Sequence, residues 1–228
     1  MDTARALLVR EILGSSPWAY RTRMFAKVLR TKTRHPGGLL LVGTPAEEPW
    51  HLAAHLSEEA KIVGAPELSP VLVRYAPPRG APDHLRVGMA RLAYACKGET
   101  VFVVAPDKIP ESLLDRLADA RKKGATLLSV DEGDKDLQSL THESLTVPPL
   151  DLLIPGEPDR RTVAPMSDLS AALTRAGAPP LSIDAVTHLI ALATGEKVPT
   201  IGSGNGSRDK LRRALDKLSG PPARQRRW

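Results

Sequence analysis

The segment TVFVVAPDKIPESLLDRLADARKKGATLLSV spans residues 100–130 and predicts a strand, a helix and a second strand in succession. Thr100 to Val104 and Ala125 to Val130 are short apolar runs of the kind that form buried strands. Between them, leucines recur at helical spacing from Pro110 to Lys123, and Gly124 ends the helix. A strand–helix–strand unit of this length predicts parallel strands joined by a crossover helix.

The same pattern continues toward the N-terminus. Residues 39–42 (LLLV) and 70–75 (PVLVRY) predict two further strands, and residues 49–63 and 83–96 predict the helices that follow them. Alternating helices and continuous apolar strands indicate an α/β fold, with about four mostly parallel strands and flanking helices.

The chain divides into five expected segments. These are basic N-terminal helices at 1–38, the α/β core at 39–150, a proline-rich linker at 151–166, a C-terminal helical segment at 167–219 and a basic tail at 220–228. Helices are predicted at 3–13 and 18–32 near the N-terminus, and at 168–176, 183–194 and 207–218 near the C-terminus.

Several classes of protein are excluded by composition. The single cysteine, Cys96, excludes a disulfide framework and a multi-thiolate zinc site, and we expect a buried, inert thiol. The segment MDTARALLVREILGSS has arginine and glutamate where a secretory signal needs apolar residues. The apolar runs are far shorter than the roughly 20 residues that span a bilayer. We therefore expect a soluble, cytoplasmic protein of bacterial origin.

The net charge of +6 is distributed unevenly along the chain. Residues 1–40 hold eight Lys/Arg and two acidic residues, and residues 207–228 hold the same numbers. Each end therefore carries +6, while residues 41–206 carry −6. Basic segments at both ends of an acidic body indicate a partner with an anionic surface.

The N-terminal basic segment combines cations with aromatic residues. Its candidate contacts to a nucleic acid are Arg21, Arg23, Lys27, Arg30 and Lys32. Trp18, Tyr20 and Phe25 lie among them and could stack on bases. The same pattern could bind an anionic membrane surface, or the helix could cover the sheet with its charges in water.

The predicted helix 207–218 has apolar residues on one side and cations on the other. The cations are Arg208, Lys210, Arg212, Arg213 and Lys217. Such a cluster can neutralise several phosphates and release their counterions, which gives salt-sensitive binding with weak sequence discrimination. A solvated amphipathic helix packed on the sheet is the alternative. The preceding glycine-rich residues 202–206 lack the pattern of a nucleotide-binding loop, so we expect a linker there.

We therefore expect a nucleic-acid-binding accessory or regulatory protein, with DNA as the favoured partner, no cofactor and a possible homo-oligomeric state. A rival class is an enzyme or sensor that binds a nucleotide or small molecule at the carboxyl ends of the parallel strands. The chain offers Gly43-Thr44, Arg74-Tyr75 and Pro106-Asp107 at those ends. A third class is a protein-interaction module whose basic ends dock on acidic partners.

A pair of histidines forms a candidate metal motif. His51 and His55 lie four residues apart on the predicted helix 49–63, with Glu59 one turn further, so one face could chelate an ion. Residue 52 is leucine, so the HExxH motif of zinc proteases is absent. No Gly-x-Ser-x-Gly motif occurs either. We therefore expect neither a bound metal nor a catalytic nucleophile.

Residues 96–131 resemble the closing half of restriction-endonuclease-like folds of the PD-(D/E)XK type, with a strand, a leucine-rich helix and a second strand. In that family, the preceding strand carries an acidic residue, one further residue and a lysine. Residues 71–75 (VLVRY) carry neither at those places, and Glu67 is a poor substitute. The resemblance therefore implies at most a catalytically degenerate nuclease-like fold that binds without cleaving.

Overall fold

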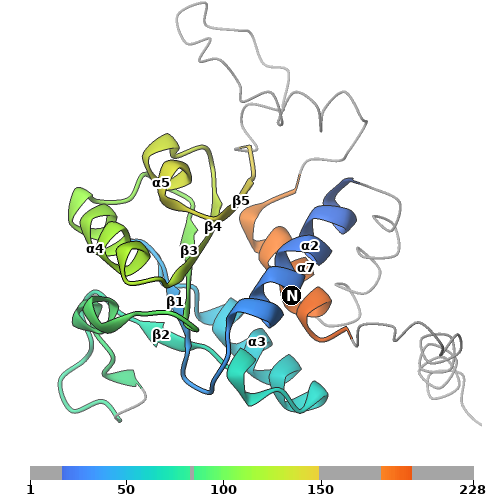
Figure 1. Ribbon diagram of the computed structural model, residues 1–228, viewed down its shortest axis with the longest axis horizontal. Coiled ribbons are helices and arrows are strands. Elements are labelled where there is room, and N and C mark those ends of the chain that lie inside the picture. The colour runs from blue at the N-terminus through green and yellow to red at the C-terminus, as the bar shows by residue number, and fades with distance from the viewer. Residues whose placement is uncertain (1–16, 83–84, 149–180, 197–228) are drawn as a thin grey trace, which may run out of the picture. The chain divides into compact units, whose positions relative to one another are not determined.

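A computed structural model describes residues 17–82, 85–148 and 181–196, all within one compact unit (Figure 1). The predicted helices at 3–13, 168–176 and 207–218, the linker at 151–166 and the basic tail at 220–228 lie outside the described residues. The five proposed nucleic-acid contacts from Arg208 to Lys217 lie outside the described residues as well.

Five parallel strands form a sheet in the order β2-β1-β3-β4-β5. The strands are β1 (Leu39–Val42), β2 (Val71–Val73), β3 (Thr100–Ala105), β4 (Thr126–Asp131) and β5 (Glu143–Thr146). The predicted α/β fold with parallel strands is confirmed. We expected about four strands, and the sheet contains a fifth, β5. Its sequence, ESLT, has no apolar run to reveal a strand, because only Leu145 is buried.

Helices cover both faces of the sheet (Figure 1). On one face pack α2 (Pro17–Lys32), α3 (Trp50–Val63) and α7 (Ile183–Thr194), and on the other pack α4 (Glu111–Lys122) and α5 (Lys135–Leu140). The 3₁₀ turns η1 (Pro66–Leu68) and η3 (Met89–Tyr94) lie in the connections. Within the described ranges, no helix has the length and apolar character needed to cross a bilayer.

Successive residues of the central strands alternate between two apolar cores. In β1, Leu39 and Leu41 join the core beneath α2, α3 and α7, while Leu40 and Val42 join the core beneath α4 and α5. All residues of β1 and β3 are buried. Burial on both faces explains why these strands are continuous apolar runs in the sequence.

Large side chains of α2 belong to the first of these cores. Trp18, Phe25 and Leu29 are buried, and the ring centroids of Phe25 and Phe102 of β3 lie 5.0 Å apart. α2 also packs along α7. Trp18 and Phe25 therefore stabilise the fold and are not exposed for stacking on bases.

The segment predicted as a helix at 83–96 has a different structure. Gly88 is extended, with φ −101° and ψ 178°, and pairs with Arg74 in an isolated bridge beside β2. The 3₁₀ turn η3 begins only at Met89. The predicted helix is therefore wrong for residues 86–88, because pairing with Arg74 holds Gly88 extended, and for residues 95–96, which follow the 3₁₀ turn.

Candidate functional site

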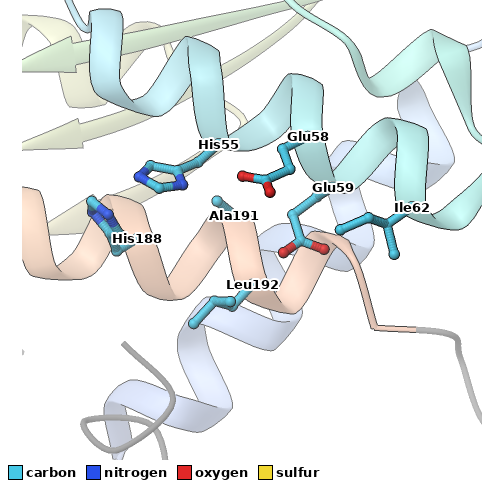
Figure 2. A pocket seen from close by; sticks show the side chains of 7 residues that line it. All are labelled: His55, Glu58, Glu59, Ile62, His188, Ala191 and Leu192. Carbon is cyan, nitrogen blue, oxygen red and sulfur yellow. The ribbon is translucent and has the colours of Figure 1, made fainter. Parts of the chain in front are cut away.

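A small pocket lies between α3 and α7 (Figure 2). It is lined by His55, Glu58, Glu59, Ile62, His188, Ala191 and Leu192. Its volume of about 50 Å³ admits one or two water-sized groups, whereas pockets for organic ligands measure about 300–1,000 Å³. The pocket is therefore too small to enclose an organic ligand.

Helical spacing brings these side chains to the pocket. The lining residues of α3 recur at i, i+3, i+4 and i+7 from His55 to Ile62, so they share one side of that helix. Those of α7 recur at i, i+3 and i+4 from His188 to Leu192. α7 begins after Ser182, whose hydroxyl accepts a hydrogen bond from the Ala185 N–H.

His188 is the most buried polar residue of the pocket, with 8% of its surface exposed. Its Nδ1 lies 3.1 Å from the carbonyl oxygen of Asp184, one turn earlier on α7. Because a carbonyl oxygen can only accept, Nδ1 carries the proton that it donates. The buried Nε2 has no hydrogen-bond partner in the described part of the chain. A neutral His188 therefore has a buried Nε2 lone pair, as many metal-binding histidines do.

The ring of His55 lies beside that of His188. The two ring centroids are 4.2 Å apart and the planes are tilted by 59° (Figure 2). Burial lowers the pKa of His55, and His188 lowers it further, while Glu58 opposes both effects. The neutral form of His55 is therefore favoured at neutral pH, which gives the pocket a second imidazole with a lone pair.

Glu58 and Glu59 add carboxylates to the pocket wall. Gly195 leaves room for Glu59, because a Cβ atom at residue 195 would lie 1.6 Å from Glu59 Oε2. Imidazoles and carboxylates together form a donor set for divalent transition metals. Among the described residues, no three metal-ligating side chains are grouped closely enough to hold an ion as they stand. An ion would therefore be held by both imidazoles with water, or with a carboxylate that moves toward them.

Of the predicted pair His51 and His55, only His55 lines the pocket. His51 is exposed and does not line the pocket, and the ring beside His55 is that of His188 from α7. Sequence reasoning missed His188, although it stands within the largely apolar run AVTHLIALA. Cys96, which we expected to be buried, is exposed because it lies in the connection after η3.

Two of the predicted nucleic-acid contacts are engaged inside the protein. Arg21 Nη2 donates to the Ser144 carbonyl oxygen at 3.2 Å. Arg30 Nη1 donates to the carbonyl oxygens of Ala193 and Thr194 at the C-terminal end of α7. Burial lowers the pKa of both arginines. These two guanidinium groups therefore join α2 to β5 and to α7.

The other three predicted contacts of α2 are accessible. Lys27 and Lys32 are exposed, and the half-exposed Arg23 lies 3.7 Å from the carboxylate of Glu196. Tyr20 is 67% exposed. Tyr20, Arg23 and Lys27 follow one another at i, i+3 and i+7, so they share one side of α2.

The candidate positions at the carboxyl ends of the strands lie along one edge of the sheet, as its parallel order requires. After β1, a Cβ atom on Gly43 would lie 2.1 Å from the Glu47 carbonyl oxygen. Thr44 is buried, and its Oγ1 accepts a hydrogen bond from the Glu47 N–H at 3.1 Å. The loop after β1 is therefore a tight turn that only glycine at residue 43 permits.

The positions after β2 and β3 differ in their surroundings. Arg74 forms an ion pair with Glu48. The buried Tyr75 hydroxyl has no hydrogen-bond partner among the described residues, and burial raises the pKa of Tyr75 to about 12. Asp107 is exposed, and Pro106 is half-buried. β2 itself carries no acidic residue and no lysine, so the nuclease-like interpretation gains no catalytic residues from the structure.

The fold and the pocket define an α/β protein with an all-parallel five-stranded sheet. No family model and no curated protein matches the sequence. Among solved structures, the chain is similar to the NanR protein of Vibrio vulnificus complexed with ManNAc-6P. The identity is 12% and the TM-score 0.41, over 96% of this chain and 75% of that chain. At this TM-score, the similarity carries no argument about function.

Proposed function

We propose that the protein is a metal-binding α/β protein of the enzyme or sensor class, with its functional site in the pocket between α3 and α7. The observation that supports this most is the buried Nε2 of His188, which has no hydrogen-bond partner among the described residues and belongs to a ring 4.2 Å from that of His55. A buried nitrogen without a hydrogen bond costs about 1–3 kcal/mol. A bound ion would remove this cost.

Zn²⁺ is the divalent ion that best matches the donor atoms lining the pocket, and side chains would have to move to bind it, because no three of them form a metal site among the described residues. Imidazole nitrogens and carboxylate oxygens are usual protein ligands of Zn²⁺. The cavity of about 50 Å³ suits an ion with one or two waters. An ion with only part of its coordination filled by protein keeps a position for an activated water or a small ligand. The proposal departs from our expectation from the sequence, which had only His51, His55 and Glu59 to consider.

Zinc binding by the full-length, tag-free protein tests this proposal. After treatment with a chelator, we expect one Zn²⁺ to bind per chain in an isothermal titration. His188→Ala should weaken binding about 100-fold, equivalent to about 2.7 kcal/mol, because one of two imidazole ligands is lost. His55→Ala should have an effect of similar size.

His51→Ala is the matched control for this titration, because His51 lies one turn away on the same helix and is exposed. It should bind zinc as the wild type does. Circular dichroism of each variant separates a loss of metal binding from a loss of fold. The proposal fails if the wild type binds no zinc, or if His188→Ala binds it with unchanged affinity.

A second candidate function is binding of a nucleic acid, with DNA favoured, by a regulatory or accessory protein. The observation that favours it is the exposed Tyr20 on the same side of α2 as Arg23 and Lys27. Aromatic rings and cations in this arrangement could contact bases and phosphates. The basic residues between Arg208 and Lys217 would add further phosphate contacts.

Fluorescence anisotropy with labelled single-stranded and duplex DNA tests this second function. We expect binding at about 50 mM salt that weakens steeply toward about 200 mM, because counterions are released. Lys27→Glu should weaken binding about 3- to 10-fold, since a phosphate contact becomes a repulsion. Lys122→Glu, at an exposed position of α4 on the other face of the sheet, is the control. Binding that is absent, or flat with salt, would exclude this function.

A further inference from the structure

Arg74 lies at the carboxyl end of β2, along the edge where parallel α/β sheets bind their ligands. Val73, the last residue of β2, is in register with Val42, the last residue of β1. The Arg74 N–H donates to the Val87 carbonyl oxygen at 2.9 Å, which extends the strand by one residue. The backbone of Arg74 is therefore fixed beside the loop that leads from β1 into α3.

The guanidinium group of Arg74 is held from two sides. Nε donates to both carboxylate oxygens of Glu48, at 3.1 and 2.9 Å. The central guanidinium carbon lies 4.7 Å from the centroid of the Trp50 ring, in a cation–π contact. The Arg74 side chain is only 15% exposed. Much of the rotamer entropy that an arginine loses on binding a ligand is therefore already lost in the free protein.

The contact with Glu48 uses only one of the five N–H donors of the Arg74 guanidinium. Within the described residues, no hydrogen bond of either Nη nitrogen is found, and 15% of the side chain remains exposed. Four N–H groups in a planar fork are thus available, in the geometry that carboxylates and phosphates accept bidentately. Glu48 lies on the Nε side, so an acceptor that approaches the Nη side meets donors.

We propose that Arg74 is the recognition residue of an oxyanion-binding site, which takes the phosphate or carboxylate group of a small ligand. Trp50, which is 40% exposed, provides an apolar surface for the rest of that ligand. This site is separate from the histidine pocket. Trp50 and His55 are five residues apart on α3, which places them about 140° apart around the helix.

The intrinsic tryptophan fluorescence provides the test, because the site includes the ring of Trp50, one of the three tryptophans of the chain. The full-length protein is titrated at constant ionic strength with inorganic phosphate, glucose 6-phosphate and succinate, with chloride as the reference anion. We expect a saturable change with at least one of the three oxyanions. Arg74→Lys should bind about tenfold more weakly, because a point charge replaces the bidentate fork, and Arg74→Ala should show no saturable change.

Arg79→Ala is the matched control, since Arg79 is an exposed arginine on the loop after β2. It should respond as the wild type does. A response to both phosphates but not to succinate identifies a phosphorylated ligand, and the reverse identifies a carboxylate. The absence of a saturable response to all three probes, or an equal response from Arg74→Ala, overturns the proposal. The His188→Ala variant should keep the response, so failure of this site and failure of the zinc site are distinguishable.

Discussion

Replacing Asp131 by alanine is expected to lower the free energy of unfolding by about 3–5 kcal/mol. Asp131 is the last residue of β4 and is fully buried. Its Oδ2 accepts hydrogen bonds from the hydroxyls of Ser129 and Ser144, both at 2.8 Å. Its Oδ1 accepts from the Gly133 N–H at 3.0 Å and from Gln138 Nε2 at 2.7 Å. Alanine would leave four donors without their acceptor, although those that are not fully buried could turn to water.

Urea denaturation followed by circular dichroism measures this loss. Asp115→Ala is the control, because Asp115 is exposed on α4 and its loss should change stability by less than about 0.5 kcal/mol. The bond from Ser144 joins β5 to β4 through this carboxylate. A loss below about 1 kcal/mol in Asp131→Ala would therefore mean that the carboxylate does little to hold the edge strand.

The central strands and the longest amphipathic segments could be predicted because their signals are local. The apolar runs at 39–42, 100–104 and 125–130 correspond to β1, β3 and β4 within one residue at each end. The predicted helix 110–123 corresponds to α4, which spans Glu111–Lys122. In each case, the residues that are buried also determine the period of the pattern.

Two elements could not be predicted because their conformation depends on distant neighbours. β5 is a strand because it pairs with β4, whereas its own sequence, ESLT, is mostly polar. Residues 86–88 fall inside the predicted helix 83–96, but Gly88 pairs with Arg74, and the Arg74 N–H donates to the Val87 carbonyl oxygen. Local propensity is weaker than these tertiary contacts.

The candidate site shows the same limit. The spacing of His51 and His55 is visible in the sequence, but the ring that lies beside His55 comes from α7. Which side of α3 faces α7 is decided by the packing of both helices on the sheet, and no spacing within α3 reports it. A search restricted to one helix therefore found His51, which is exposed, and missed His188.

Counting charges along the sequence also gives the number of cations, but not whether each side chain points into the protein or into solvent. Arg21 and Arg30 contribute to the basic N-terminal segment in the sequence, but their guanidinium groups donate to backbone carbonyl oxygens of β5 and α7. Lys27 and Lys32 remain exposed. The cations of α2 therefore form two groups, one with structural contacts inside the protein and one accessible to solvent. Only the packing of α2 in the core distinguishes the two groups.

That packing leads to an expected loss of about 3–5 kcal/mol of stability when Phe102 is replaced by alanine. Phe102 is fully buried in β3, and its ring lies 5.0 Å from that of Phe25 in α2, with the planes tilted by 54°. Tilted aromatic pairs contribute about 0.5–1.5 kcal/mol beyond their buried area. If α2 and the sheet unfold together, the double substitution should therefore cost less than the sum of the single ones by about this amount.

Urea unfolding of Phe25→Ala, Phe102→Ala and the double variant measures this coupling. Because domains have only about 5–15 kcal/mol of stability, the corresponding leucine substitutions provide a milder cycle in which all variants stay folded. Tyr94→Ala is the control, since Tyr94 is 77% exposed and should leave stability within about 0.5 kcal/mol of the wild type. A separate transition in the Phe25 variants, without coupling to Phe102, would mean that α2 unfolds independently of the sheet. Arg21 and Arg30 would then be released from β5 and α7 as α2 detached, and all five of its predicted cations would become accessible to a nucleic acid.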